Sequence, residues 1–260
     1  MITTKHYTLN KMDTTAVDQL WKEIKPVYDH HFNHVFNQDY LSAKCKDAFV
    51  ARLRVIWQDA EAVGVMMLFG YKVKVNNKTM TLYRASAAVD QAHRSKSNLS
   101  SFMFSSVIPI ALRQGFRNQY FTEGFIHPSA FSLAQKNIAQ IYPSPDQATP
   151  QTIVDLMKVI PKDSNVLNGL EFKYDNPFLA YCPLNTFQTH QEVISWQQKI
   201  QTDAHIEYFH QQGGLQNHRA FICIAPVTIK NMVLSLLKSR RNRAKYMAQK
   251  KKQSRELAHA

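Results

Sequence analysis

The sequence predicts a single α/β domain whose mixed, mostly antiparallel sheet is flanked by helices. Seven consecutive odd positions from Val63 to Val75 are apolar, which is the period of two of a strand with one buried face. Around that strand, amphipathic segments alternate with short strands in the order helix, strand, strand hairpin, loop, helix, strand, helix. A chain of 260 residues is long enough to bury a large core in one such domain.

The N-terminal half supplies these elements in order. Asp13 is placed to cap a first helix, and residues 49–57 alternate as a strand does. Residues 63–75 and 79–89 then predict a hairpin, because Asn76 and Asn77 between them tolerate a positive φ. An amphipathic helix beginning near residue 99 is expected to end at Gly115, followed by a strand over 119–127 and a helix over 129–142.

The C-terminal half is less regular and begins with a cluster of prolines. Residues 151–160 predict a helix, and residues 170–183 one or two extended pieces. A long helix is expected from about residue 186 to 212, then a last strand and a terminal helix. We therefore divide the chain into a core (1–142), an elaboration that completes the sheet (143–237) and a basic helical tail (238–260).

Charge is concentrated in that tail. Residues 238–260 contain nine Lys or Arg against one acid, within a chain whose net charge is +13. Such a tail can bind nucleic acid or anionic lipid, and the alternative is a solvated, frayed helix. Three widely spaced cysteines exclude a disulfide scaffold and suit a reducing compartment, and the sequence has no apolar run of membrane-spanning length. We therefore expect a cytoplasmic protein.

The loop between the second hairpin strand and the following helix has the layout of a phosphate site. It reads VDQAHRSKSNLSSF over residues 89–102. A loop entering a helix presents unpaired N–H groups and the positive end of the helix dipole, which suit a pyrophosphate. Arg94 and Lys96 add positive charge, and three serines add hydroxyl donors. The alternative is a basic, N-capped helix that binds no ligand.

This strand-loop-helix unit resembles the pyrophosphate loop of the GNAT superfamily of acyl-CoA-dependent N-acyltransferases. The family pattern runs from a valine, here Val89, through His93 and Arg94 to a glycine-rich step and a helix. By order of elements, the resemblance covers roughly residues 5–142. The sequence departs from the family at the glycine-rich step, where Ser97 and Leu99 stand at positions that are usually Gly and Gly or Ala.

The resemblance implies a GNAT-type fold and acetyl-CoA or another acyl-CoA as co-substrate. The pantetheine arm would lie in a V-shaped gap between the strands at 79–89 and 120–127, bonded to backbone groups near Ala87, Ala88 and Val89. The pyrophosphate would be held by the loop and the start of its helix. These positions are Arg94, Ser95, Lys96, Ser97, Asn98, Leu99 and Ser100.

Amine acylation needs a group that takes the amine proton and a group that protonates the leaving thiolate. Glu123 is the candidate base, because a carboxyl in an apolar mid-strand setting has a raised pKa. His127 is predicted on the same strand face as a proton relay, and Tyr142 is the candidate acid at the end of the next helix. The alternatives are an ion-paired Glu123, a loop-entry His127 and a hydrophobic anchor at Tyr142. We expect no metal site.

The function predicted from the sequence is transfer of an acyl group, most simply acetyl, from coenzyme A to an amine by direct attack on the thioester. The amine would belong to a small molecule or a protein, and no motif names it. The rival is a non-catalytic binding module of the same fold whose basic tail docks on nucleic acid or an acidic partner. A transferase that uses acyl carrier protein or aminoacyl-tRNA as donor is a third alternative.

Overall fold

A computed structural model describes residues 1–32, 36–90, 92–93, 99–160, 170–182, 190–216 and 218–258. These residues form one seven-stranded sheet of order β1-β2-β3-β4-β5-β7-β6. Its strands are β1 (Ile2–Thr8), β2 (Val50–Gln58), β3 (Glu61–Val75), β4 (Lys78–Val89), β5 (Gln119–Phe125), β6 (Leu179–Tyr181) and β7 (Arg219–Pro226). Only β4 and β5 pair in parallel, so the sheet is mixed and mostly antiparallel, as the sequence predicts.

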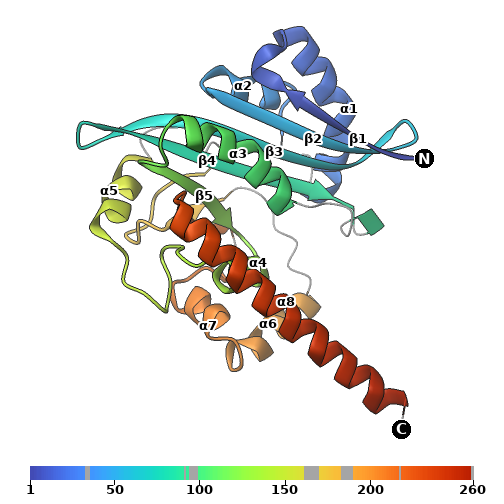
Figure 1. Ribbon diagram of the computed structural model, residues 1–260, viewed down its shortest axis with the longest axis vertical. Helices are drawn as coiled ribbons and strands as arrows, with labels where there is room; N and C mark the ends of the chain where they lie inside the picture. The colour runs from blue at the N-terminus through green and yellow to red at the C-terminus, as the bar shows by residue number, and fades with distance from the viewer. Residues whose placement is uncertain are drawn as a thin grey trace.

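Helices flank both faces of this sheet (Figure 1). They are α1 (Thr14–Phe32), α2 (Tyr40–Lys46), α3 (Leu99–Arg113), α4 (Pro128–Asn137), α5 (Gln151–Val159), α6 (His190–Ile200), α7 (Ala204–Gln211) and α8 (Ile229–Ala258). A short 3-10 turn, η1 (Leu9–Lys11), joins β1 to α1. None of the described helices is both long and apolar enough to cross a membrane.

The two faces of the central hairpin enter different hydrophobic cores. Leu82 and Ala88 of β4 join the core beneath α1, whereas Tyr83, Ala85 and Val89 join the core beneath α3. Every residue of β3 from Ala62 to Tyr71 is therefore buried. The expectation of one buried face is wrong for that stretch, because α3 covers the second face, and alternation returns only beyond Tyr71.

The ends of α1 and α3 follow local backbone chemistry. The Asp13 carboxylate accepts the Ala16 N–H at 2.8 Å, which caps α1 as expected. Gly115 adopts a φ of +72° just beyond α3, a left-handed conformation that glycine reaches without steric cost. Pro26 lies inside α1 rather than at its end.

Three sequence-based assignments differ from the structure. The segment at Ile2–Thr8 is an edge strand paired with β2, which the sequence analysis did not assign. The helix expected over 129–142 ends at Asn137. The long helix expected to 212 is two helices, because the Asp203 carboxylate accepts the N–H groups of His205 and Ile206 and so starts α7 afresh.

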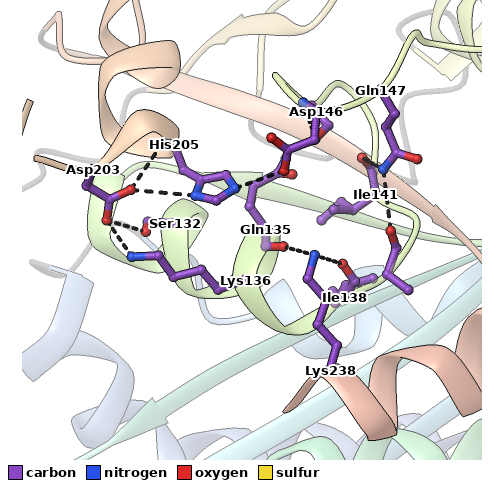
Figure 2. Close-up of polar contacts among 12 residues, drawn as sticks. Ser132, Gln135, Lys136, Ile138, Ile141, Asp146, Gln147, Asp203, His205 and Lys238 are labelled. Atoms are coloured by element: carbon purple, nitrogen blue, oxygen red, sulfur yellow. Dashed lines mark hydrogen bonds and ion pairs between the residues drawn. The ribbon is translucent and has the colours of Figure 1, made fainter. Parts of the chain in front are cut away.

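The Asp203 carboxylate also connects α7 to α4 (Figure 2). Its Oδ2 accepts from the Ser132 hydroxyl at 2.8 Å and from the Lys136 ammonium at 2.6 Å. The ring of His205 lies between Asp203 and Asp146, at 3.5 and 3.3 Å. These contacts fix the C-terminal half against α4.

Helix α8 is attached at its beginning and extends away from the body at its end (Figure 1). The Lys238 ammonium donates to the carbonyls of Gln135 and Ile138 at the end of α4, at 2.7 and 3.2 Å (Figure 2). Asn242 donates to the Lys136 carbonyl at 2.5 Å. The basic segment from residue 238 is therefore continuous with α8, and its first turn contributes structural hydrogen bonds.

Replacing Asp203 by Ala should destabilise the fold. Burial alone would raise the pKa of Asp203, but hydrogen bonds from Lys136 and Ser132 outweigh burial and hold that pKa below its usual value. Its contribution is therefore complete above pH ~4 and is lost as the pH falls through the lowered pKa. We expect Asp203→Ala to lower the free energy of unfolding by about 1–3 kcal/mol at pH 7, measured by urea denaturation.

The difference between wild type and Asp203→Ala should stay constant from pH 8 to 5 and shrink below pH ~4. Asp175→Ala is the matched control, because Asp175 is exposed. Equal loss of stability in the two variants would contradict the assigned role of Asp203.

Candidate functional site

The most distinctive feature of the sheet is a gap between β4 and β5. The two strands pair only where Thr81, Leu82 and Tyr83 lie beside Gln119, Tyr120 and Phe121. Beyond this point β4 continues to Val89 and β5 to Phe125, and no register joins them. On its other side β4 stays paired with β3 up to Val89. Among the described residues, Ala85 and Ala87 of β4 therefore have a strand partner on the β3 edge only.

Backbone groups of β4 face this gap. The Thr81 N–H donates to the Asn118 carbonyl on the β5 side, and the Asp90 N–H donates to Val63 on the β3 side. Because the direction of the N–H alternates along a strand, Ala85 and Ala87 present their N–H and C=O groups to the gap. In the described part of the chain, neither residue has a backbone partner there. Ala88 is oriented the other way: its N–H and C=O point toward Val65 of β3 and not toward the gap.

Glu123 lies on the β5 side of the gap. The Gly124 N–H, which alternation directs toward β4, donates to the Glu123 carboxylate at 3.3 Å. Burial raises the pKa of Glu123 to about 7, although Arg84, the Gly124 N–H and Lys44 each act to lower it. At neutral pH this carboxyl is thus protonated in part of the molecules and ionised in the rest. A pKa near the working pH suits a group that takes up a proton during a reaction.

Side chains of α1, α2 and β4 interact electrostatically with that carboxyl; they are Tyr28, Tyr40, Lys44 and Arg84. The Tyr28 hydroxyl lies 3.0 Å from the Ser86 hydroxyl, and the Tyr71 hydroxyl donates to the Lys44 carbonyl at 3.2 Å. Arg84 lies between Leu82 and Ser86 on the same face of β4. Burial raises the pKa of Tyr28, so this phenol stays neutral and can donate a hydrogen bond.

The entrance to the predicted phosphate loop is anchored on both sides. At the end of β4, Asp90 lies 3.2 Å from His31 of α1. Two residues of a short turn follow, and the ring of His93 lies 2.8 Å from the Gln58 amide oxygen of β2. Leu99 and Ser100 begin α3. The remaining predicted phosphate ligands lie outside the described residues; they are Arg94, Ser95, Lys96, Ser97 and Asn98.

Two predicted catalytic residues are not where the sequence analysis expected them. β5 ends at Phe125, so His127 does not share the strand face of Glu123. It is instead the N-cap of α4, exposed, with its ring 5.8 Å from that of Trp196. Tyr142 lies beyond the end of α4 and forms a β-bridge with Ile224 of β7. Its side chain is 7% exposed and packs in the core, which is the position expected of a hydrophobic anchor.

Lys44 and Arg84 were missed by the sequence analysis, although the sequence contains a signal for each. Lys44 follows buried Leu41 by three positions, which places both on one face of α2. Arg84 follows Leu82 by two positions, which places both on one face of β4. No local pattern could indicate that Glu123, 39 residues after Arg84 and 79 after Lys44, would interact with them.

Candidate features outside the gap were a surface cleft, metal-binding side chains and the cysteines. A surface cleft of about 570 Å³ between α1 and the β2–β3 turn is lined by Glu23, Trp57 and Asp59, among others. The described residues contain no group of three or more His, Cys, Asp or Glu side chains placed to hold a metal ion. All three cysteines are free thiols.

No family model and no curated protein matches this chain. Solved structures with similar parts include a probable N-acyltransferase from Enterococcus faecalis V583, 10% identical with a TM-score of 0.37. That match covers 54% of this chain and 34% of the other, so this chain spans about a third of that protein. An aminoglycoside acetyltransferase from an uncultured soil metagenomic sample is 11% identical, with a TM-score of 0.36 over 58% of this chain and 98% of the other.

A third similar structure is an integron cassette protein of V. cholerae, 11% identical with a TM-score of 0.36, covering 57% of this chain and 90% of the other. At these identities and TM-scores the likenesses say nothing about chemistry. The functional argument therefore rests on the gap, Glu123 and its neighbours.

Replacing Glu123 by Gln should stabilise the fold at neutral and alkaline pH. A carboxyl whose pKa is raised to about 7 disfavours folding in its ionised form, so it reduces stability progressively from pH ~4.5 to ~7 and by a constant amount above. We expect Glu123→Gln to raise Tm by a few degrees at pH 8, since 1 kcal/mol corresponds to about 2–4 °C in a chain of this size.

At pH 4.5 the gain should vanish, because wild-type Glu123 is then protonated as well. Differential scanning calorimetry at the two pH values measures this difference. The exposed Glu61→Gln variant is the control and should show no pH-dependent gain. An equal or lower Tm of Glu123→Gln at pH 8 would show that the Glu123 site does not disfavour the ionised carboxylate.

Proposed function

We propose that this protein is an acyl-CoA-dependent N-acyltransferase, with acetyl the simplest acyl group and a small-molecule or protein amine as acceptor. The observation that carries the proposal is the divergence of β4 from β5, with the backbone groups of Ala85 and Ala87 lacking a strand partner among the described residues on one side and a carboxyl with a pKa of about 7 on the other. These backbone groups could bond to the pantetheine arm of the coenzyme, and the carboxyl could take the proton that the acceptor amine loses.

The pantetheine arm would extend along β4 in the manner of an additional strand. An extended amide chain can donate to and accept from the groups of Ala85 and Ala87. These residues carry only methyl side chains, so the arm could approach the β4 backbone closely. The diphosphate would then lie near the loop after Val89, where the N-terminus of α3 favours negative charge.

In the proposed reaction the neutral amine attacks the thioester carbonyl. The carbon–nitrogen bond forms, the carbon–sulfur bond breaks, and coenzyme A leaves as its thiolate. Glu123, directly or through water, takes the proton that the amine loses. The thiolate must also gain a proton, and Tyr28 is a neutral phenol on the same side of the sheet. The products are the amide and free coenzyme A.

The activity of Glu123→Gln tests the base. Loss of a general base lowers kcat by about 10²–10⁴-fold, while binding of acetyl-CoA should remain, because Glu123 contacts the acceptor side. In the wild type, kcat/KM should rise with pH and level off above an apparent pKa of about 7. Release of thiol from acetyl-CoA in the presence of an amine panel measures both.

Wild-type turnover in the Glu123→Gln variant would show that Glu123 is not the catalytic base. Absence of any thermal shift with acetyl-CoA, desulfo-CoA and longer acyl-CoAs would contradict the transferase proposal itself. The Glu61→Gln variant controls for the loss of an acidic charge at the surface.

The competing function is a binding module that docks through α8, and the projecting basic end of this helix is the observation that favours it (Figure 1). A deletion that tests it must spare Lys238 and Asn242, which bond to α4. We expect deletion of residues 246–260 to leave the affinity for acetyl-CoA unchanged. Binding to a nucleic acid, if it occurs, should fall steeply with salt and disappear in the deletion.

Isothermal titration with acetyl-CoA and fluorescence anisotropy with a labelled oligonucleotide at 50 and 200 mM salt separate the two functions. Oligonucleotide binding without acetyl-CoA binding would favour the binding module. Loss of acetyl-CoA binding in the folded deletion would contradict the placement of the coenzyme site.

A further inference from the structure

Lys44 is a buried residue whose amine has no anionic partner among the described residues. Its side chain is 4% exposed, and the ammonium lies 5.7 Å above the ring of Tyr40. Within the described part of the chain, the amine has neither a hydrogen-bond acceptor nor an ion pair. A buried charge without a partner is costly, so burial of a lysine in this state needs an explanation.

The structure holds Lys44 over the candidate site. Its carbonyl accepts from the Tyr71 hydroxyl at 3.2 Å, and Tyr71 lies directly beside Leu82 of β4. Arg84 is the next residue on that face of β4, at the position where β5 begins to diverge. The backbone of Lys44 is therefore held over the face of the sheet that carries Leu82 and Arg84, and its side chain is buried rather than exposed on the outer surface of α2.

The charges around Glu123 are mostly positive. Burial and the charge of Arg84 lower the pKa of Lys44, whereas Glu123 raises it. The other titratable groups that affect this cluster are Tyr28, Tyr40 and Tyr71, whose pKa values are raised by burial, and Cys223 opposite Glu123, whose pKa is also raised. Cys45 and Asp47 act in turn on Tyr71. Arg84 and Lys44 are the two basic side chains that act on Glu123, and both favour its ionised form.

These two basic side chains favour a ligand that carries a negative charge over one that carries a positive charge. A negative group placed beside Lys44 would favour the charged form of this amine and supply a partner that the described residues do not provide. The same group, if it belonged to the acceptor, would bring the acceptor amine toward Glu123.

We propose that the acceptor of this enzyme is an amine that also carries an anionic group, and that Lys44 is the counter-ion of that group. The proposal rests on the proposed acyltransferase function and adds the class of acceptor. A carboxylate and a phosphomonoester share the required chemistry. Lys44 is thus a specificity-determining residue, and the acylated product keeps the anion unchanged.

Matched acceptor pairs test this proposal. Each pair contains an anionic amine and a neutral analogue: an α-amino acid with its carboxamide, and O-phosphoethanolamine with ethanolamine. Initial rates with acetyl-CoA give the ratio of kcat/KM within each pair. The ratio is then compared among wild type, Lys44→Met, Lys44→Arg and Lys46→Met, so that intrinsic differences in amine reactivity cancel.

We expect the ratio for at least one pair to fall by about tenfold or more in Lys44→Met, mainly through KM, since 1.4 kcal/mol corresponds to a factor of ten. Lys44→Arg should retain part of the preference. Lys46, on the same helix but exposed, should not change it. An unchanged ratio in folded Lys44→Met for both pairs would overturn the proposal, and the pair that responds identifies the anion.

A second measurement separates this proposal from the proposed function. If no amine is acylated, the transferase function fails, and thermal shifts with the N-acetyl amino acid and its N-acetyl carboxamide still report on the anion site. Stabilisation by the acid alone, lost in Lys44→Met, would support a Lys44 anion site. Equal shifts, or no shift with the acid, would refute it.

Discussion

The structure depends on one constraint in the sheet: β4 loses its partner on the β5 side after Tyr83 but keeps β3 as a partner to Val89. β4 pairs with β3 along its length, and its two faces pack in the cores beneath α1 and α3. The edge that faces β5 is therefore supported by the rest of β4. A strand edge of this kind can bind an extended ligand as an additional strand.

Glu123 becomes chemically useful because of the same divergence. A strand paired on both edges would direct the Gly124 N–H into a ladder bond, but here it donates to the Glu123 carboxylate. The side chain lies in partly buried surroundings with Arg84 and Lys44 as the nearby cations, and its pKa settles near neutrality. The gap and the half-ionised carboxyl are thus two consequences of one topological feature.

Much of the fold could be predicted from local patterns, and the failures have physical reasons. The alternation of β3 and the turn at Asn76–Asn77 define the hairpin without any tertiary information. β1 was missed because an edge strand has little apolar periodicity, and the break at Asp203 was missed because a capping aspartate inside a helical pattern resembles a surface residue. Glu123 could be selected as a buried strand acid, whereas Lys44 and Arg84 depend on contacts between segments far apart in sequence. His127 and Tyr142 were misplaced because the ends of β5 and α4 are set by packing.

The central claim is that the edge of β4 receives an acyl-CoA, and amide hydrogen exchange of residues 84–89 tests it most directly. In the free protein the amides of Ala85 and Ala87 face the gap and should exchange faster than those of Ser86 and Ala88, which bond to β3. Saturating desulfo-CoA, which cannot react, should slow exchange at Ala85 and Ala87 selectively. Binding of desulfo-CoA that leaves both amides at their free-state rates would contradict this account.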